Sequence, residues 1–289
     1  MRLGFHISIA GGLSRVIPRA LKTGCDTIQI FSGNPRGWKR RSLEGEEVET
    51  FHADLSQTEI TPVFVHASYL INLASPDAVL YSRSIASLGD ELSRAYRLGA
   101  QFVIVHVGNR LNTEESLAMN RIAAAVNHVF RKADNSVRLL LENTAGQGTE
   151  VGFTFRQLAG IVELIDEKER LGFCLDTAHA FAAGYDLSAF VGLDRLIREI
   201  EVSVGLDSLK ALHLNDSRAG LGSRVDRHWH IGEGGIGMPG FLNILSHPVL
   251  AALPGIMETP RERDADDLKN MKVMRSLIRQ CGSDCPLLK

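Results

Sequence analysis

Eight short apolar segments recur along the chain at intervals of about 25 to 45 residues, and this rhythm restricts the fold more than any other sequence feature. Segments this short and apolar are typical of parallel strands that are buried on both faces. They are Leu3–His6, Thr27–Phe31, Thr61–His66, Phe102–Val107, Val137–Glu142, Gly172–Asp176, Leu209–Leu214 and Gly255–Glu258. We therefore expect eight parallel strands.

The intervening segments have the apolar periodicity of amphipathic helices. The helical segments expected are Pro76–Leu98, Glu114–Ala133, Thr154–Ile165, Leu187–Val204, Gly240–Leu245 and Ala265–Arg279. Gly99 should end the first of them, and Thr154 should cap another. Eight strand–helix units in 289 residues match a closed TIM (β/α)8 barrel better than an open doubly wound sheet, and no GxGxxG motif follows the first strand. We predict one α/β domain over residues 1–289.

Ionisable side chains stand at the ends of six of these strands. The C-terminal ends of TIM-barrel strands meet at one mouth, where the active site is built. The six residues are His66, His106, Glu142, Asp176, His213 and Glu258. A single histidine at a strand end is more often a hydrogen-bonded core residue. Six such residues at one mouth, with buried carboxylates that are costly to desolvate, instead predict bound cations.

Three further candidate ligands follow the strands. His179 lies three residues after Asp176, and Asp226 and His228 are spaced so that their side chains point the same way in an extended loop. The nine candidates are five histidines and four carboxylates, a mixture that suits zinc, manganese or iron rather than calcium or magnesium. Nine ligands exceed the needs of one ion. Two or three clustered metals are therefore expected, an arrangement that typically activates water for displacement at a phosphate.

Other polar residues near the predicted mouth are not assigned as ligands. His6 and His230 are close enough in the pattern to support ligands by hydrogen bonding, and the sequence does not decide their role. Asp216 and Glu233 are expected to order loops or to support ligands.

The composition is typical of a soluble, cytoplasmic protein. The chain is 44% hydrophobic and 23% charged, with no apolar run of about 18 residues and no signal-peptide pattern. The formal net charge is −2, so any nucleic-acid surface must be a local patch. Cys25, Cys174, Cys281 and Cys285 lack the spacing of a disulfide framework, and the last two are given no role. No apolar stripe indicates an obligate oligomer, so we expect a monomer.

Six motifs surround the candidate ligands. They are His66-Ala-Ser-Tyr-Leu-Ile-Asn-Leu73, Leu141-Glu-Asn-Thr-Ala-Gly-Gln-Gly148, Cys174-Leu-Asp-Thr-Ala-His179, Leu212-His-Leu-Asn-Asp-Ser217, Asp226-Arg-His228 with Gly232-Glu-Gly234, and Met257-Glu-Thr-Pro260. In this order, over almost the whole chain, they resemble endonuclease IV, the zinc-dependent apurinic/apyrimidinic (AP) endonuclease family of base excision repair. Any one motif could arise by chance, whereas the ordered set is specific.

The resemblance implies an enzyme that hydrolyses the phosphodiester bond 5′ of abasic sites in duplex DNA and leaves a 3′-hydroxyl. It implies three zinc ions per chain, and manganese shares such ligands. By motif, the first zinc is held by His66 and His106, Glu142 bridges it to the second, the second is completed by Asp176, His213 and Glu258, and the third is held by His179, Asp226 and His228. A hydroxide between the first two ions would attack the phosphate, with Glu142 and Glu258 as catalytic residues.

The resemblance also indicates a DNA-binding surface. Tyr69 and Leu70 match the family's loop that wedges into the duplex, where they would fill the gap left by an extruded nucleotide. Arg36 and Trp38 lie in a loop that holds four cations between Arg36 and Arg41 and that matches a DNA-contact loop of the family.

Two other functions remain open. A metal-dependent sugar isomerase or epimerase would share the barrel and the ligands at the strand ends, but it would have no use for Asp226, His228 or the Tyr69–Leu70 loop. A non-catalytic protein that binds damaged DNA could use zinc structurally, although structural zinc sites are typically closed and rich in cysteine.

Overall fold

The eight predicted strands form a closed parallel barrel. The structure is a computed structural model that describes residues 1–284, so Cys285 lies outside the described residues. The barrel strands are β1 (Leu3–His6), β2 (Thr27–Phe31), β3 (Val63–His66), β4 (Phe102–Val105), β5 (Arg138–Glu142), β6 (Leu171–Asp176), β7 (Leu209–His213) and β10 (Gly255–Met257). Their order around the barrel is the chain order, and β10 pairs with β1 to close it. The prediction of a TIM barrel is confirmed.

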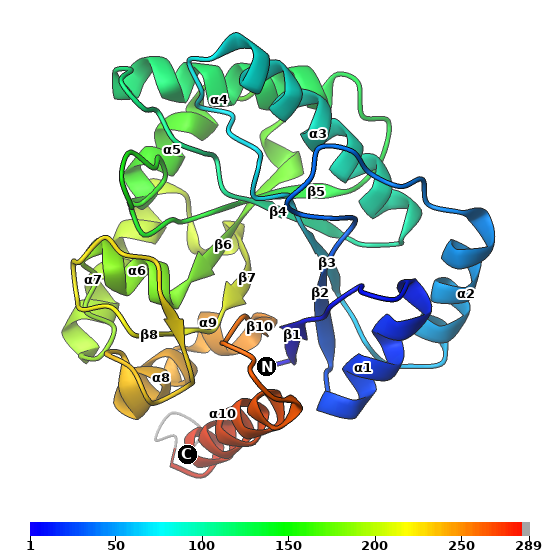
Figure 1. The fold of residues 1–289 in the computed structure, drawn as a ribbon. Helices are drawn as coiled ribbons and strands as arrows, with labels where there is room; N and C mark the ends of the chain where they lie inside the picture. The colour runs from blue at the N-terminus through cyan, green and yellow to red at the C-terminus, as the bar shows by residue number, and fades with distance from the viewer. Residues whose placement is uncertain (285–289) are drawn as a thin grey trace.

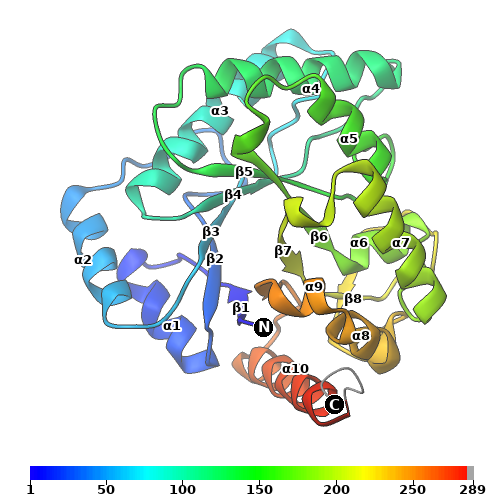
Figure 2. The ribbon, with the colours of Figure 1, turned by 180° about the vertical axis from the view of Figure 1, so that it is seen from behind.

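Helices surround the strands on the outside in both views (Figures 1 and 2). They are α1 (Val16–Thr23), α2 (Gly45–Ser56), α3 (Ala78–Arg97), α4 (Glu115–Phe130), α5 (Phe155–Glu163), α6 (Thr177–Ala183), α7 (Phe190–Ser203), α8 (Gly237–Ser246), α9 (Pro248–Ala252) and α10 (Asp264–Asp284). Thr154 caps α5 as predicted, accepting a hydrogen bond from the backbone N of Gln157, and Gly99 follows α3 with φ +68°. No helix among the described residues is long and apolar enough to cross a membrane.

The sequence patterns missed four helices: α1, α2, α6 and α9. Helix α2 buries only Phe51 fully, and α6 and α9 have seven and five residues, so none has a long apolar stripe. A two-stranded antiparallel ribbon of β8 (Asp216–Ser217) and β9 (His228–Trp229) was also missed, and it orders the long loop after β7.

The inside of the barrel is filled by one apolar layer. It consists of Phe64, Ile104, Leu140, Cys174, Ala211 and Ile256, all without measurable exposure, with Phe102 packed against them. Successive side chains of a strand point to opposite faces, so the residue two positions further along each strand also points into the barrel. The next layer toward the mouth is therefore set by six defined positions.

Candidate metal centre

The six predicted ligands of the strand ends occupy this second layer. Each stands two residues after a member of the apolar layer: His66, His106, Glu142, Asp176, His213 and Glu258. Four of them are the last residues of their strands, whereas His106 and Glu258 directly follow β4 and β10. Strand register adds to this, because Asp176 is paired with His213 across β6 and β7. The strands therefore deliver all six side chains to the same mouth of the barrel.

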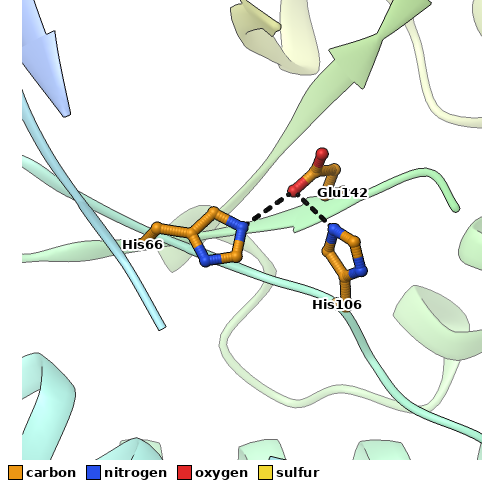
Figure 3. A group of neighbouring side chains, drawn as sticks. All are labelled: His66, His106 and Glu142. Atoms are coloured by element: carbon orange, nitrogen blue, oxygen red, sulfur yellow. Dashed lines mark hydrogen bonds and ion pairs between the residues drawn. The ribbon is translucent and has the colours of Figure 1, made fainter. Parts of the chain in front are cut away.

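Glu142 lies at the centre of the layer. Its fully buried carboxylate is 3.0 Å from His106 Nε2 and 3.3 Å from His66 Nε2, and these three side chains point toward one another from neighbouring strands (Figure 3). On its other oxygen, His213 Nδ1 lies at 2.8 Å and His179 Nδ1 at 3.4 Å. One carboxylate thus joins four imidazoles.

A second group continues from Glu142 across the barrel. Besides Glu142, His213 Nδ1 faces Oε2 of Glu258 at 3.3 Å and Oδ2 of Asp176 at 3.8 Å. The side chains of His213 and Asp176 have no exposed surface. This group has one imidazole and three carboxylates.

The third group is built by helix α6 and the ribbon. Asp176 caps α6, since its Oδ1 accepts a hydrogen bond from the backbone N of His179 at 2.7 Å, and this turn brings His179 over the barrel. His179 Nε2 lies 3.3 Å from both Nε2 of His228 and Oδ2 of Asp226. The side chain of Asp226 is 40% exposed, so this group faces the solvent most.

Within residues 1–284, three sets of ligand atoms have the spacing to hold a metal ion. They are His66, His106 and Glu142; Glu142, Asp176, His213 and Glu258; and Asp176, His179 and His228, with the atoms of each set within 4.8 Å of one another. Glu142 and Asp176 each belong to two sets, so the three sets are contiguous. Asp226 adjoins the third set through both of its histidines.

Hydrogen bonds at the far side of four imidazoles orient them for metal binding. His66 donates Nδ1–H to the carbonyl of Ala67 at 2.8 Å, and His179 donates to that of Asn143 at 2.9 Å. His228 makes the same kind of bond to the carbonyl of Glu258 at 3.3 Å, and His213 donates Nε2–H to Oε1 of Gln29 at 2.8 Å. In each ring the other nitrogen faces the centre, where its lone pair would coordinate a metal ion that displaced the proton, as in metal-binding histidines.

The charges at the centre fit bound cations. Burial alone would raise the pKa of Glu142, but the positive charges of His213 and His106 outweigh it and hold its pKa well below the usual range. Burial would likewise lower the pKa of His213, and nearby Cys174 and Glu142 raise it instead. The buried carboxylates therefore need positive partners. The Nε2 atoms of His179 and His228 face each other, so one cation between them would be coordinated by both.

Sequence reasoning missed three amide side chains that support these ligands. Gln29, fully buried, donates to Oε1 of Glu258 at 2.6 Å as well as accepting from His213. Asn143 accepts a hydrogen bond from the backbone N of Asp176, and Asn215 donates to its Oδ2 at 2.8 Å. Only Asn143 and Asn215, which adjoin ligands within the motifs, could have signalled this role.

The undecided residues now have positions. His6 lies 3.0 Å from Oε1 of Glu258, at the wall of the centre, whereas His230 contacts Asn270 of α10. Asp216 accepts hydrogen bonds from four backbone N–H groups of residues 232–237 and so orders that loop, as expected. Glu233 pairs with Lys269 at the surface.

An open cavity of about 420 Å³ lies above the metal centre. Tyr69 lines it, with a side chain that is 61% exposed and a ring set edge-on to Phe31, while Leu70 is half-buried. Arg36 and Trp38 are exposed on the neighbouring loop, and the carbonyl of Pro35 in that loop accepts a hydrogen bond from Ser68. The predicted DNA-contact residues thus lie on two adjoining loops beside the cavity.

The fold and the centre define the class of protein, a xylose isomerase-like TIM barrel, and residues 17–280 match the model of that family. The chain is 47% identical over 276 residues to "Probable endonuclease 4" of Methanoculleus marisnigri, with 95% of this chain and 98% of the relative covered. It superposes on endonuclease IV from Thermus thermophilus with a TM-score of 0.86 and 37% identity, covering 97% and 100% of the two chains. The chain belongs to the endonuclease IV family.

A more distant match shows only the shared fold. A D-tagatose 3-epimerase-like protein superposes with a TM-score of 0.77 at 19% identity, with 98% of this chain and 99% of the other covered.

Proposed function

We propose that this protein is a DNA-repair endonuclease that hydrolyses the phosphodiester bond 5′ of abasic sites in duplex DNA and leaves a 3′-hydroxyl. The proposal depends mainly on the three contiguous ligand sets at the floor of an open cavity that Tyr69 borders. Membership of the endonuclease IV family supports the same activity.

Zinc is the proposed cofactor, at three ions per chain, and manganese would accept the same donors. His66 and His106 would hold the first ion, Glu142 would bridge to the second, Asp176, His213 and Glu258 would complete the second, and His179, Asp226 and His228 would hold the third. Bound ions of this kind supply an activated water and offset the charge that develops on a phosphate.

Glu142 and Glu258 are the proposed catalytic residues. Burial alone would raise the pKa of Glu258, but the charge of His213 and the hydrogen bond of His6 hold it well below the usual range. Both carboxylates therefore stay ionised at neutral pH. Glu142 joins two ligand sets, and Glu258 also lines the cavity where a phosphate would enter.

The substrate is held by the rim of the cavity in this proposal. Tyr69 and Leu70 would enter the duplex at the lesion, where unstacking costs least, while Arg36 and Trp38 would contact the adjoining strand. Three zinc ions would also move the formal charge of the protein from −2 to +4, which favours a polyanionic ligand. The protein is proposed to act as a cytoplasmic monomer.

The test is cleavage of a duplex oligonucleotide with one abasic-site analogue, before and after removal of metal by a chelator, together with metal analysis by mass spectrometry. We expect one incision 5′ of the lesion, a 3′-hydroxyl product, close to three metals per chain, and loss of activity with the metals. An identical duplex without the lesion is the control.

Two outcomes would overturn parts of the proposal. Three bound metals without incision would leave the metal centre in place and reject the substrate. Interconversion of ketoses in the same preparation, without incision, would instead establish the isomerase alternative.

A further inference from the structure

Helix α3 carries a polar strip of Ser87, Glu91 and Arg94 that plays no part in the metal centre. Residues spaced by four and three positions lie on one face of a helix. Glu91 is 2% exposed and Arg94 is 7% exposed, and such charged residues are seldom buried unless they are paired. Their partners show what the strip does.

The Glu91 carboxylate binds two different loops. Its Oε1 accepts hydrogen bonds from Nη2 of Arg40 at 2.6 Å and from the backbone N of Ser68 at 3.0 Å. Its Oε2 accepts from Oγ of Ser32 at 2.6 Å. Ser32 and Arg40 belong to the loop after β2, and Ser68 belongs to the loop after β3.

Further bonds make one unit of these segments. Arg94 donates from Nε to the carbonyl of Ser32 at 3.2 Å and from Nη1 to the carbonyl of Arg41 at 2.9 Å. Ser68 Oγ donates to the carbonyl of Pro35 at 2.7 Å, which joins the two loops directly. Arg40 also donates to Ser87 at 3.0 Å, and only 8% of its side chain is exposed. Arg40 is therefore a buried member of this network and not a free cation of the loop.

We propose that Glu91 is a positioning residue that holds residues 32–41 and 67–71 in one fixed arrangement, so that Tyr69 and Arg36 meet DNA together. The part of this proposal that concerns DNA binding rests on the proposed function, whereas the coupling of the two loops does not. The backbone N of Ser68, which Glu91 binds, belongs to the residue directly before Tyr69. The bond from Glu91 to Arg40 fixes the loop that carries Arg36 and Trp38. Fixing both loops before binding removes the cost of ordering them on the substrate.

The chosen variant is Glu91→Gln, with Asp90→Asn as its matched control. A glutamine removes the charge that pairs with Arg40 and strengthens the hydrogen bonds at Oε1, and its amide nitrogen at the Oε2 position could keep the contact with Ser32 only if the hydroxyl turned to accept. Asp90 also accepts a hydrogen bond from Arg40, at 3.3 Å, but the side chain of Asp90 is 46% exposed. Asp90 forms no hydrogen bond or ion pair with residues 67–71.

Amide hydrogen exchange tests the arrangement without reference to activity. In Glu91→Gln, exchange should accelerate on the order of 10-fold in both residues 32–41 and residues 67–71, with the barrel strands and the metal content unchanged. Asp90→Asn should leave both loops as they are. Acceleration in only one loop, or in neither, would overturn the proposal.

Kinetics on abasic DNA separate positioning from a general structural effect. Glu91→Gln should raise KM for the lesion duplex about 10- to 100-fold while kcat at saturating DNA changes little. A fall in kcat together with metal content, at unchanged KM, would overturn the proposal. If Glu91→Gln does not fold, Glu91→Asp is the second variant: it keeps the charge but shortens the side chain by one methylene, so that one carboxylate no longer reaches Arg40, Ser32 and Ser68 N together. Exchange should then accelerate in both loops, and unchanged exchange would overturn the proposal. If the wild-type protein fails to cleave DNA, the proposed function fails while the exchange experiment still decides the coupling of the loops.

Discussion

Two successive layers inside the barrel differ in chemistry although the same strands build them. The lower layer is Phe64, Ile104, Leu140, Cys174, Ala211 and Ile256, and the upper layer is His66, His106, Glu142, Asp176, His213 and Glu258. Only two residues, one strand repeat, separate each apolar side chain from the ionisable one above it. The apolar side chains thus pack the interior of the barrel, and the ionisable side chains lie closer to its mouth.

The two layers should respond differently to the same kind of change. An apolar layer is stabilised by close packing, so its substitution lowers the free energy of unfolding through loss of buried contacts. Buried charges gain stability only from partners that offset their desolvation. Metal removal and a change of pH should therefore alter the stability that the upper layer contributes and leave the contribution of the lower layer unchanged.

The largest effect is expected at Glu142. Glu142→Gln keeps the shape of the side chain but removes the charge that joins two ligand sets, so cleavage of abasic DNA should fall by about 10³-fold or more. Metal content by mass spectrometry should fall as well, while circular dichroism shows the barrel intact. Binding of the lesion duplex should persist. A wild-type protein that binds the lesion duplex without cleaving it, and that loses this binding in Glu142→Gln, would favour the non-catalytic DNA-binding alternative.

Leu140, directly below Glu142, provides the contrasting substitution. Leu140→Ala should lower the free energy of unfolding by about 2–5 kcal/mol, because it leaves a cavity in a fully packed layer. The folded fraction should keep its metals and its cleavage rate. Urea denaturation and metal analysis on the same samples measure both quantities. If metals were lost in proportion to stability, the two layers would not be independent.

The sequence predicts this layering well because strand alternation is local. Six of the nine candidate ligands were found at or next to the last residue of an apolar segment, although His106 and Glu258 proved to follow β4 and β10 instead of lying within them. Contacts between segments that are distant in the chain could not be predicted from the sequence. Arg40 reads as one of four loop cations, yet it is buried against Glu91, 51 positions away. Gln29 sits within an apolar strand, and nothing in one sequence shows that its amide meets His213 and Glu258.

Gln29 tests how far the upper layer depends on its neutral supports. Gln29→Leu removes the acceptor that orients His213 and the donor to Glu258, so metal affinity should fall about 10- to 100-fold at the set shared by these residues. Competition with a chelator of known affinity measures the change. Thr27→Val, on the same strand with its hydroxyl bonded to the carbonyl of Pro62, is the control and should leave metal affinity unchanged. An equal loss in both variants would mean that the strand, and not the amide, is responsible.

The pH dependence of stability should reverse on metal removal. In the metal-free protein the pKa values of His179 and His213 are raised, so their contribution is complete below about pH 6.5 and is lost as pH rises through the raised values. The lowered pKa values of Glu142 and Glu258 act below about pH 4.5, where protonation removes their contribution. Chelated protein should therefore have a lower Tm at pH 8 than at pH 6. With zinc, Tm should rise over the same range because protons no longer compete for the ligands. Parallel Tm curves would contradict this.

The smallest effect is expected above both layers, at the rim. Tyr69→Ala with Leu70→Ala removes an exposed ring, which packs beside Phe31 and His66, and a half-buried leucine side chain. Neither side chain supplies a ligand atom, so Tm and metal content should stay close to the wild-type values. Preference for abasic over intact duplex should fall on the order of 10-fold, since an aromatic side chain that stacks on a base contributes about 1–3 kcal/mol. Binding to the two duplexes, measured at one salt concentration, gives the ratio. Loss of metal in this variant would place the loop inside the centre and remove the distinction between rim and ligand layer, whereas an unchanged ratio would show that recognition of the lesion lies with the metals and the cavity floor alone.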